Sequence, residues 1–83
     1  VVVFFGNGLI DLFGNRVLES FRNAGVEVGQ YCELDTTRIE DIIEIAFSID
    51  AKTQAVVGIG GGKVIDVAKY VSYLRKMHYL LYL

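Results

Sequence analysis

Three consecutive glycines followed by a lysine, Gly60–Lys63, are the residues whose types and spacing point most directly to chemistry. They follow a short apolar segment, Ala55–Ile59, and precede a segment with helical periodicity. Glycine lets the backbone turn tightly and lets its N–H groups approach a ligand closely. The first N–H groups of a helix lack intrahelical partners and lie at the positive end of its dipole, which favours an anion. The pattern predicts a phosphate-binding turn, and a turn that only packs a helix closely against a strand remains the alternative.

Two common nucleotide motifs match this stretch only in part. The dinucleotide fingerprint G-x-G-x-x-G is met at Gly58 and Gly60, but Lys63 stands at the position of the third glycine. The P-loop pattern has its glycine–lysine pair, but Val57 replaces its first glycine and Val64 replaces its hydroxyl residue. No hydroxyl is therefore placed for a magnesium ion, which argues against a nucleoside triphosphatase.

The ten residues Gly60–Lys69 resemble the G-G-G-(S/K)-x-x-D-x-A-K signature of the iron-dependent alcohol dehydrogenase and glycerol dehydrogenase superfamily. The lysine after the glycines, with Val64-Ile65 before Asp66, is most similar to the glycerol-1-phosphate dehydrogenase branch. The sister family of 3-dehydroquinate synthases usually has glycine at the position of Lys69, so this residue favours the dehydrogenases. The order of strands and helices extends the resemblance over nearly the whole chain, up to Met77.

The resemblance implies a cofactor site for NAD or NADP. In the family, the glycines and the residues after them bind the pyrophosphate of the cofactor. Some relatives place an acid after the first strand to hold the adenine ribose. Gly6 or Asn7 stands there in this chain, which leaves room for a 2′-phosphate and keeps NADP open. The cofactor-binding residues that we expect are Gly60, Gly61, Gly62, Lys63, Val64 and Asp66.

The resemblance also implies what residues 1–83 lack. In the family, a divalent metal (zinc, iron or nickel) polarises the substrate oxygen while hydride passes between the nicotinamide and the substrate carbon. An Asp and two His of a following helical domain hold that metal, and nothing in this chain corresponds to them. We therefore assign no catalytic residue and no metal ligand, and we expect no turnover by this chain alone.

We expect residues 1–83 to form a single dinucleotide-binding domain, a piece of a longer enzyme. By resemblance, that enzyme is a cytoplasmic, homo-oligomeric alcohol or polyol dehydrogenase that acts on glycerol 1-phosphate, glycerol or a similar polyol. A non-catalytic flavodoxin-like module that binds a phosphorylated ligand, or a 3-dehydroquinate synthase, is the alternative.

The composition limits the kinds of partner that the chain is expected to bind. The net charge of −2 gives no basic field, which argues against nucleic acid. No apolar run approaches the ~20 residues needed to span a membrane. The single cysteine, Cys32, excludes an internal disulfide, suits a reducing compartment and is expected to act as a small core hydrophobe. The single histidine, His78, has no neighbouring ligands with which to share a metal and is expected to be structural.

Hydrophobic periodicity predicts strands that alternate with helices, which is typical of a parallel sheet covered on both faces. The first and third strands are apolar throughout and hence central, whereas the second alternates and hence lies at an edge. The fold class is therefore a three-layer α/β domain with a Rossmann- or flavodoxin-like strand order 2-1-3-4. The strands are expected at 1–5, 27–34, 55–59 and 77–83, and the helices near 9–24, 37–50 and 63–76.

In this strand order the first and third strands are neighbours, and ligands bind at the carboxyl ends of strands beside such a switch point. The topology therefore predicts that the two glycine turns, Gly6–Gly8 and Gly58–Lys63, lie at one crevice. Asp35, after the second strand, would either reach a ribose there or cap the second helix. Thr37 and Glu40 predict a capping box at the start of that helix.

Overall fold

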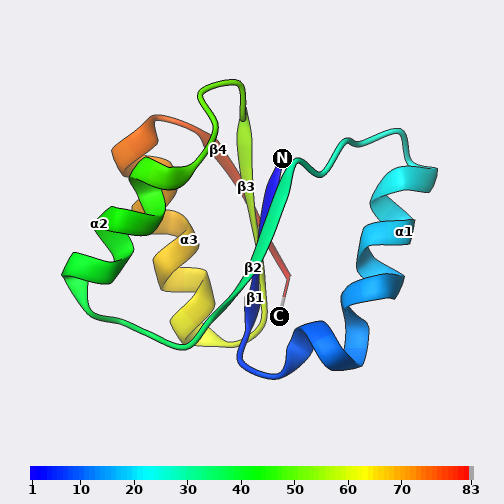
Figure 1. Cartoon of the computed structure of the whole chain (residues 1–83), viewed down its shortest axis with the longest axis horizontal. Helices are drawn as coiled ribbons and strands as arrows, with labels where there is room; N and C mark the ends of the chain where they lie inside the picture. The colour runs from blue at the N-terminus through cyan, green and yellow to red at the C-terminus, as the bar shows by residue number, and fades with distance from the viewer. Residues whose placement is uncertain (83) are drawn as a thin grey trace.

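A parallel sheet of four strands in the order β2-β1-β3-β4 forms the middle layer of the computed structural model, which describes residues 1–82 (Figure 1). The predicted class and strand order are confirmed. The expected last residue of the fourth strand, Leu83, lies outside the described residues. The strands are β1 (Val2–Gly6), β2 (Gln30–Leu34), β3 (Ala55–Ile59) and β4 (His78–Tyr82).

Helices cover both faces of this sheet. Helices α2 (Ile39–Ser48) and α3 (Gly62–Arg75) lie on one face, and α1 (Asn15–Asn23) lies on the other (Figure 1). The first helical segment differs from expectation because it opens with a π-helical turn, η1 (Ile10–Gly14), before α1 begins. Within the described part of the chain, no helix is long and apolar enough to cross a membrane.

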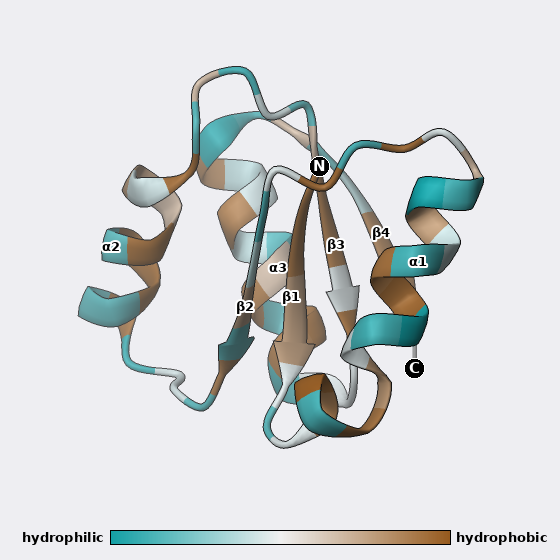
Figure 2. Cartoon of the chain, turned by 45° about the vertical axis from the view of Figure 1, so that its right-hand side comes forward, coloured by the Kyte–Doolittle hydropathy of each residue, from teal (hydrophilic) through white to brown (hydrophobic). Residues whose placement is uncertain are grey.

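The two central strands are buried because both of their faces are covered. Figure 2 shows β1 as a continuous hydrophobic strand, whereas β2 at the edge is largely hydrophilic. Successive residues of a strand point to opposite faces, so each central strand supplies both cores. Val2, Phe4 and Val56 pack toward α2 and α3, and Val3, Phe5 and Val57 pack toward α1.

The edge strands expose more of their side chains. In β2 only Leu34 is fully buried, and Cys32 is half-buried against the α2–α3 core, as expected of a small core hydrophobe. Burial raises the pKa of the Cys32 thiol. Strand β4, at the other edge of the sheet, leaves Leu80 and Tyr82 about half exposed.

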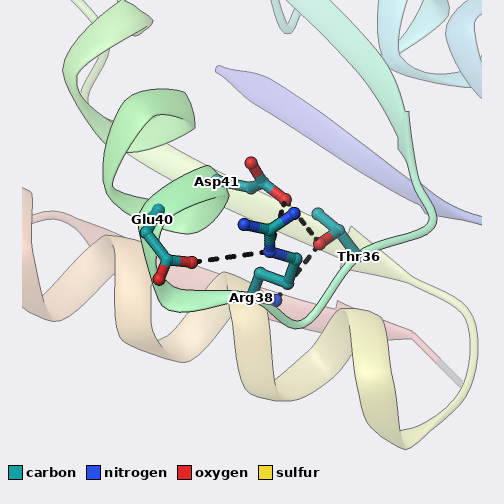
Figure 3. Close-up of polar contacts among 4 residues, drawn as sticks. All are labelled: Thr36, Arg38, Glu40 and Asp41. Atoms are coloured by element: carbon teal, nitrogen blue, oxygen red, sulfur yellow. Dashed lines mark hydrogen bonds and ion pairs between the residues drawn. The ribbon is translucent and has the colours of Figure 1, made fainter.

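The predicted capping box at the start of α2 is wrong. The residue that precedes the helix is Arg38, and its side chain makes no capping bond. The hydroxyl of Thr36 organises the turn instead: it accepts a hydrogen bond from Arg38 N at 3.1 Å and donates one to Asp41 Oδ2 at 2.9 Å (Figure 3). Glu40 lies 3.6 Å from Arg38 Nε in an exposed ion pair, and does not pair with Thr37. The helix therefore begins two residues later than the sequence predicts.

Candidate functional site

The two glycine turns meet at the carboxyl ends of β1 and β3. These strands pair in register from Val2↔Val56 to Phe5↔Ile59, so the residues after them come side by side. A Cβ atom built on Gly60 would lie 3.2 Å from both N and Cα of Gly6. The structure thus brings the two predicted turns into direct backbone contact.

Two glycines of the second turn are needed for packing. A Cβ on Gly58 would lie 2.9 Å from the Cβ of Ala68 in α3. A Cβ on Gly60 would lie 2.7 Å from Cγ1 of Val64, and the φ of +144° at Gly60 is one that side chains rarely adopt. At these two positions the packing alternative left open by the sequence is correct, because only glycine lets α3 and β1 approach β3 so closely.

Gly61 and Gly62 are different, because nothing in residues 1–82 requires them to be glycine. A Cβ atom on either would have no heavy atom within 4 Å. Gly61 has φ −85° and ψ −167°, which is extended backbone that other residues also adopt. Both glycines are exposed at the start of α3. Bare, exposed backbone of this kind leaves room for a ligand to approach its N–H groups closely.

The N-terminus of α3 has free donors at this place. Gly61 precedes the helix and provides no side-chain cap, and the first backbone bond of the helix runs from Ile65 N to the carbonyl oxygen of Gly61 at 3.2 Å. Within residues 1–82, the N–H groups of Gly61, Gly62, Lys63 and Val64 have no hydrogen-bond partner. Such groups, at the positive end of a helix dipole, form a site for an anion.

The side chains around these donors differ in their exposure. Lys63 is exposed and makes no ion pair within the described residues, so its ammonium group is free to meet an anion. Val64 is 2% exposed, so only its backbone N–H can face a ligand. Asp66 is exposed about one turn further along α3 and makes no hydrogen bond within residues 1–82. The predicted cofactor residues therefore lie together, with Asp66 at the margin.

A hollow lies beside the glycine turn, on the α1 side of the sheet. Its volume is about 450 Å³, within the range of small-molecule sites. Tyr82 anchors this region, since its carbonyl oxygen accepts a hydrogen bond of 2.9 Å from Gly60 N. The hollow could not be predicted from the sequence, because three separate segments of the chain form it. Its lining residues are Arg16, Val17, Ser20, Phe21, Ala24, Ile59 and Tyr82.

Glu33 is a second residue that the sequence analysis missed. It lies next to the end of β2, and its Oε1 accepts a hydrogen bond of 3.3 Å from Ile10 N at the start of η1. Asp35, the acid chosen from the sequence, is exposed and makes no hydrogen bond within the described part of the chain, so its expected capping role is wrong. The signal that points to Glu33 is its position one residue before the buried Leu34, which turns it toward the α1 face.

His78 lies at the opposite end of the sheet from this site. It begins β4 and pairs with Ala55 at the amino end of β3. No group of three or more His, Cys, Asp or Glu side chains in residues 1–82 is arranged to hold a metal ion. The candidate site is therefore an anion-binding turn, built from backbone and one lysine.

A parallel α/β sheet with an open glycine turn before a helix, at the switch point of the strand order, is an arrangement at which many α/β proteins bind ligands. The sequence profile of the iron-containing alcohol dehydrogenase family matches residues 1–81. The chain belongs to this family.

Several relatives are named for one activity. The chain is 32% identical over 80 residues to a glycerol-1-phosphate dehydrogenase, NAD(P)+, of Methanobrevibacter smithii, covering 96% of this chain and 22% of the relative. It is 33% identical over 79 residues to the protein of the same name from Methanothermobacter thermautotrophicus, covering 95% and 22%. The crystal structure of glycerol dehydrogenase from Schizosaccharomyces pombe matches with a TM-score of 0.80 at 20% identity, covering 96% of this chain and 20% of that one. The chain thus spans about a fifth of the length of these proteins.

Proposed function

We propose that this chain is the NAD(P)-binding part of an alcohol or polyol dehydrogenase of the iron-containing family. The observation that carries the proposal is the pair Gly61 and Gly62, which lack side chains although no contact within the described residues requires glycine there. They expose unpartnered N–H groups at the start of α3. The pyrophosphate of a dinucleotide fits this place, because it is an anion that must approach the backbone closely.

Five of the six predicted residues then have a part in the site, and Asp66 lies at its margin without an assigned contact. The N–H groups of Gly61, Gly62, Lys63 and Val64 bind the pyrophosphate, and the Lys63 ammonium group adds a charge-assisted hydrogen bond. Gly60 shapes the turn and makes no bond to the cofactor, since its N–H is already donated to Tyr82. The bound nicotinamide cofactor supplies the hydride chemistry.

The substrate and the metal of the longer enzyme are inferred from its relatives, not from the residues of this chain. Because the relatives are named for glycerol 1-phosphate and glycerol, we infer a polyol or polyol phosphate as the substrate of the longer enzyme. The side chains of residues 1–82 offer no set of metal ligands, so no step through a metal is assigned to them. A homo-oligomeric enzyme and a cytoplasmic location stay predictions.

A nuclear magnetic resonance titration tests the proposal. The ¹⁵N-labelled chain is titrated with NAD+, and the amide shifts are mapped onto the structure. We expect the largest shifts at Gly61, Gly62, Lys63 and Val64, because their N–H groups receive the pyrophosphate. Inorganic pyrophosphate should move the same amides more weakly. Shifts confined to other parts of the sheet would contradict the assignment.

A further inference from the structure

Helices α2 and α3 carry apolar side chains that no described part of the chain covers. Ile39, Ile43 and Phe47 recur every fourth residue along α2, so they form a stripe, and all three are exposed. Tyr70 and Leu74 form an exposed pair with the same spacing on α3. Contiguous apolar surface of this kind is uncommon on a monomer and marks a place where another surface binds.

The two helices hold these side chains on one support. Figure 1 shows α2 and α3 side by side on the same face of the sheet. They are also joined at one end, because Arg75 Nη1 in α3 donates hydrogen bonds to the carbonyl oxygens of Ala46 and Ile49. Their buried sides pack into one shared core. We call the exposed apolar surface of this pair the α2–α3 face, which consists of Ile39, Ile43, Phe47, Tyr70, Tyr73 and Leu74.

The two halves of the α2–α3 face carry opposite charges. Helix α2 has two exposed acids, Glu40 and Glu44, and contains no lysine or arginine. Helix α3 has two exposed lysines, Lys63 and Lys69, and a single acid, Asp66. Within residues 1–82, neither Glu44 nor Lys69 makes an ion pair. The face is therefore acidic along one helix and basic along the other.

These charges determine how a second copy of the chain would fit. A twofold axis parallel to the two helices lays α2 of one copy on α3 of the other, so unlike charges meet on both sides of the axis. A twofold axis across the helices would lay α2 on α2, with acids against acids. The first arrangement is self-complementary, as a twofold interface must be.

From this charge pattern we infer that the α2–α3 face binds a second copy of the chain, with α2 of each copy packed on α3 of the other. The inference concerns assembly and goes beyond the proposed function. Aromatic side chains at the centre and charged side chains at the rim are typical of protein interfaces. Phe47 is 78% exposed and Tyr73 is 74% exposed, so both are free to pack against a partner.

The size of the face sets the expected strength of the dimer. The 14 residues of α3 span about 21 Å, and two packed helices cover a width of about 20 Å. The face thus measures roughly 400 Å², about half of the ~800 Å² that each partner buries in a standard interface. We therefore expect a weak dimer that forms at micromolar or higher concentration.

Sedimentation equilibrium of the purified chain tests the inference, with a monomer–dimer equilibrium as the expected result. Phe47→Glu should raise the dissociation constant about 30-fold or more, because the dimer buries this side chain twice. Its exposure in the monomer means that the fold should be kept, which circular dichroism checks. Leu80→Glu is the matched control, because it places the same charge on an exposed apolar position of β4 and should leave the dissociation constant unchanged.

A pair of charge reversals tests the arrangement of the two copies. Glu44 and Lys69 lie near the middle of α2 and α3, so the inferred axis brings them together. Glu44→Lys and Lys69→Glu should each raise the dissociation constant about fivefold, because like charges then face each other. The double variant should restore it, since unlike charges meet again. Single variants without effect, or a double variant weaker than both, would contradict the packing of α2 on α3.

Three other results would overturn the inference. The first is a chain that stays monomeric at millimolar concentration. The second is a dimer that Leu80→Glu abolishes and Phe47→Glu leaves unchanged, because β4 would then be the contact. The third comes from the longer enzyme, in which Phe47→Glu should reduce the number of subunits. If that variant only lowers the melting temperature at an unchanged number of subunits, the rest of the longer chain covers the α2–α3 face instead.

Discussion

Replacing Gly61 by valine should block the site while leaving the fold intact. A Cβ at Gly61 would meet no atom within 4 Å, and its φ of −85° suits any residue, so the protein tolerates the side chain. Valine is a poorer residue than glycine before a helix, which sets the cost in unfolding free energy at about 1 kcal/mol or less. In the proposed function the pyrophosphate occupies the same space, so the valine side chain should displace it from the N–H groups of α3.

The loss of affinity follows from those hydrogen bonds. A hydrogen bond to a charged group contributes about 1.5–3 kcal/mol. Losing one such bond weakens binding by roughly 10- to 150-fold, since every 1.4 kcal/mol is about tenfold. Titration of NADH fluorescence on the unaltered and Gly61→Val chains measures this difference, and urea unfolding followed by circular dichroism measures the stability of both.

Two further variants serve as controls for the Gly61→Val experiment. Gly29→Val also adds a branched side chain in open space, but outside the site, so it should leave affinity unchanged. Gly60→Val should destabilise the chain severely, because its Cβ would lie 2.7 Å from Val64 Cγ1 at a φ of +144°. If folded Gly61→Val binds NADH as tightly as the unaltered chain, the glycine turn is not the cofactor site.

Three other predictions concern stability and activity. Arg75→Met should lower the unfolding free energy by about 2–3 kcal/mol in urea titrations, because Arg75 Nη1 donates to the carbonyl oxygens of Ala46 and Ile49 at 2.5 and 2.9 Å. A loss of unfolding free energy no larger than that caused by Arg75→Lys would contradict this. Lys76→Gly should raise the melting temperature, because Lys76 has a φ of 55° and a left-handed residue other than glycine lowers the unfolding free energy by roughly 1 kcal/mol. An unchanged or lower melting temperature would show that the backbone at Lys76 is not strained. The purified chain with zinc, nickel or iron and either cofactor should not oxidise glycerol, glycerol phosphate or simple alcohols, because the described residues contain no metal-binding group; metal-dependent formation of NADH or NADPH would refute this.

The strand order could be predicted because the number of buried faces of a strand determines the pattern of apolar and polar residues along it. Strands β1 and β3 are apolar throughout since helices cover both of their faces, and β2 alternates since it lies at an edge. The start of α2 was misplaced because two neighbouring threonines could form the turn before the helix. The structure uses Thr36, which bonds to Arg38 N and Asp41 Oδ2, and not Thr37.

The site was predictable in place but not in detail. Four glycines of one short stretch look alike in the sequence, yet Gly58 and Gly60 are required by contacts with α3 and β1, and Gly61 and Gly62 are not. Only tertiary contacts separate these pairs. Glu33 was overlooked for the same reason, since its partner Ile10 is 23 residues away in the chain. The local sequence pattern thus locates the turn, and tertiary contacts determine which of its backbone N–H groups are open to a ligand.

The position of the pyrophosphate in a crystal structure of the chain with NAD+ is the decisive test of the proposed cofactor site at the N-terminus of α3. We predict phosphate oxygens at hydrogen-bond distance, about 2.7–3.2 Å, from the backbone nitrogens of Gly61, Gly62, Lys63 and Val64. We also predict little movement of Gly60, whose N–H stays bonded to Tyr82. A pyrophosphate bound on the Gly6–Gly8 turn instead, with the N-terminus of α3 left in solvent, would contradict it.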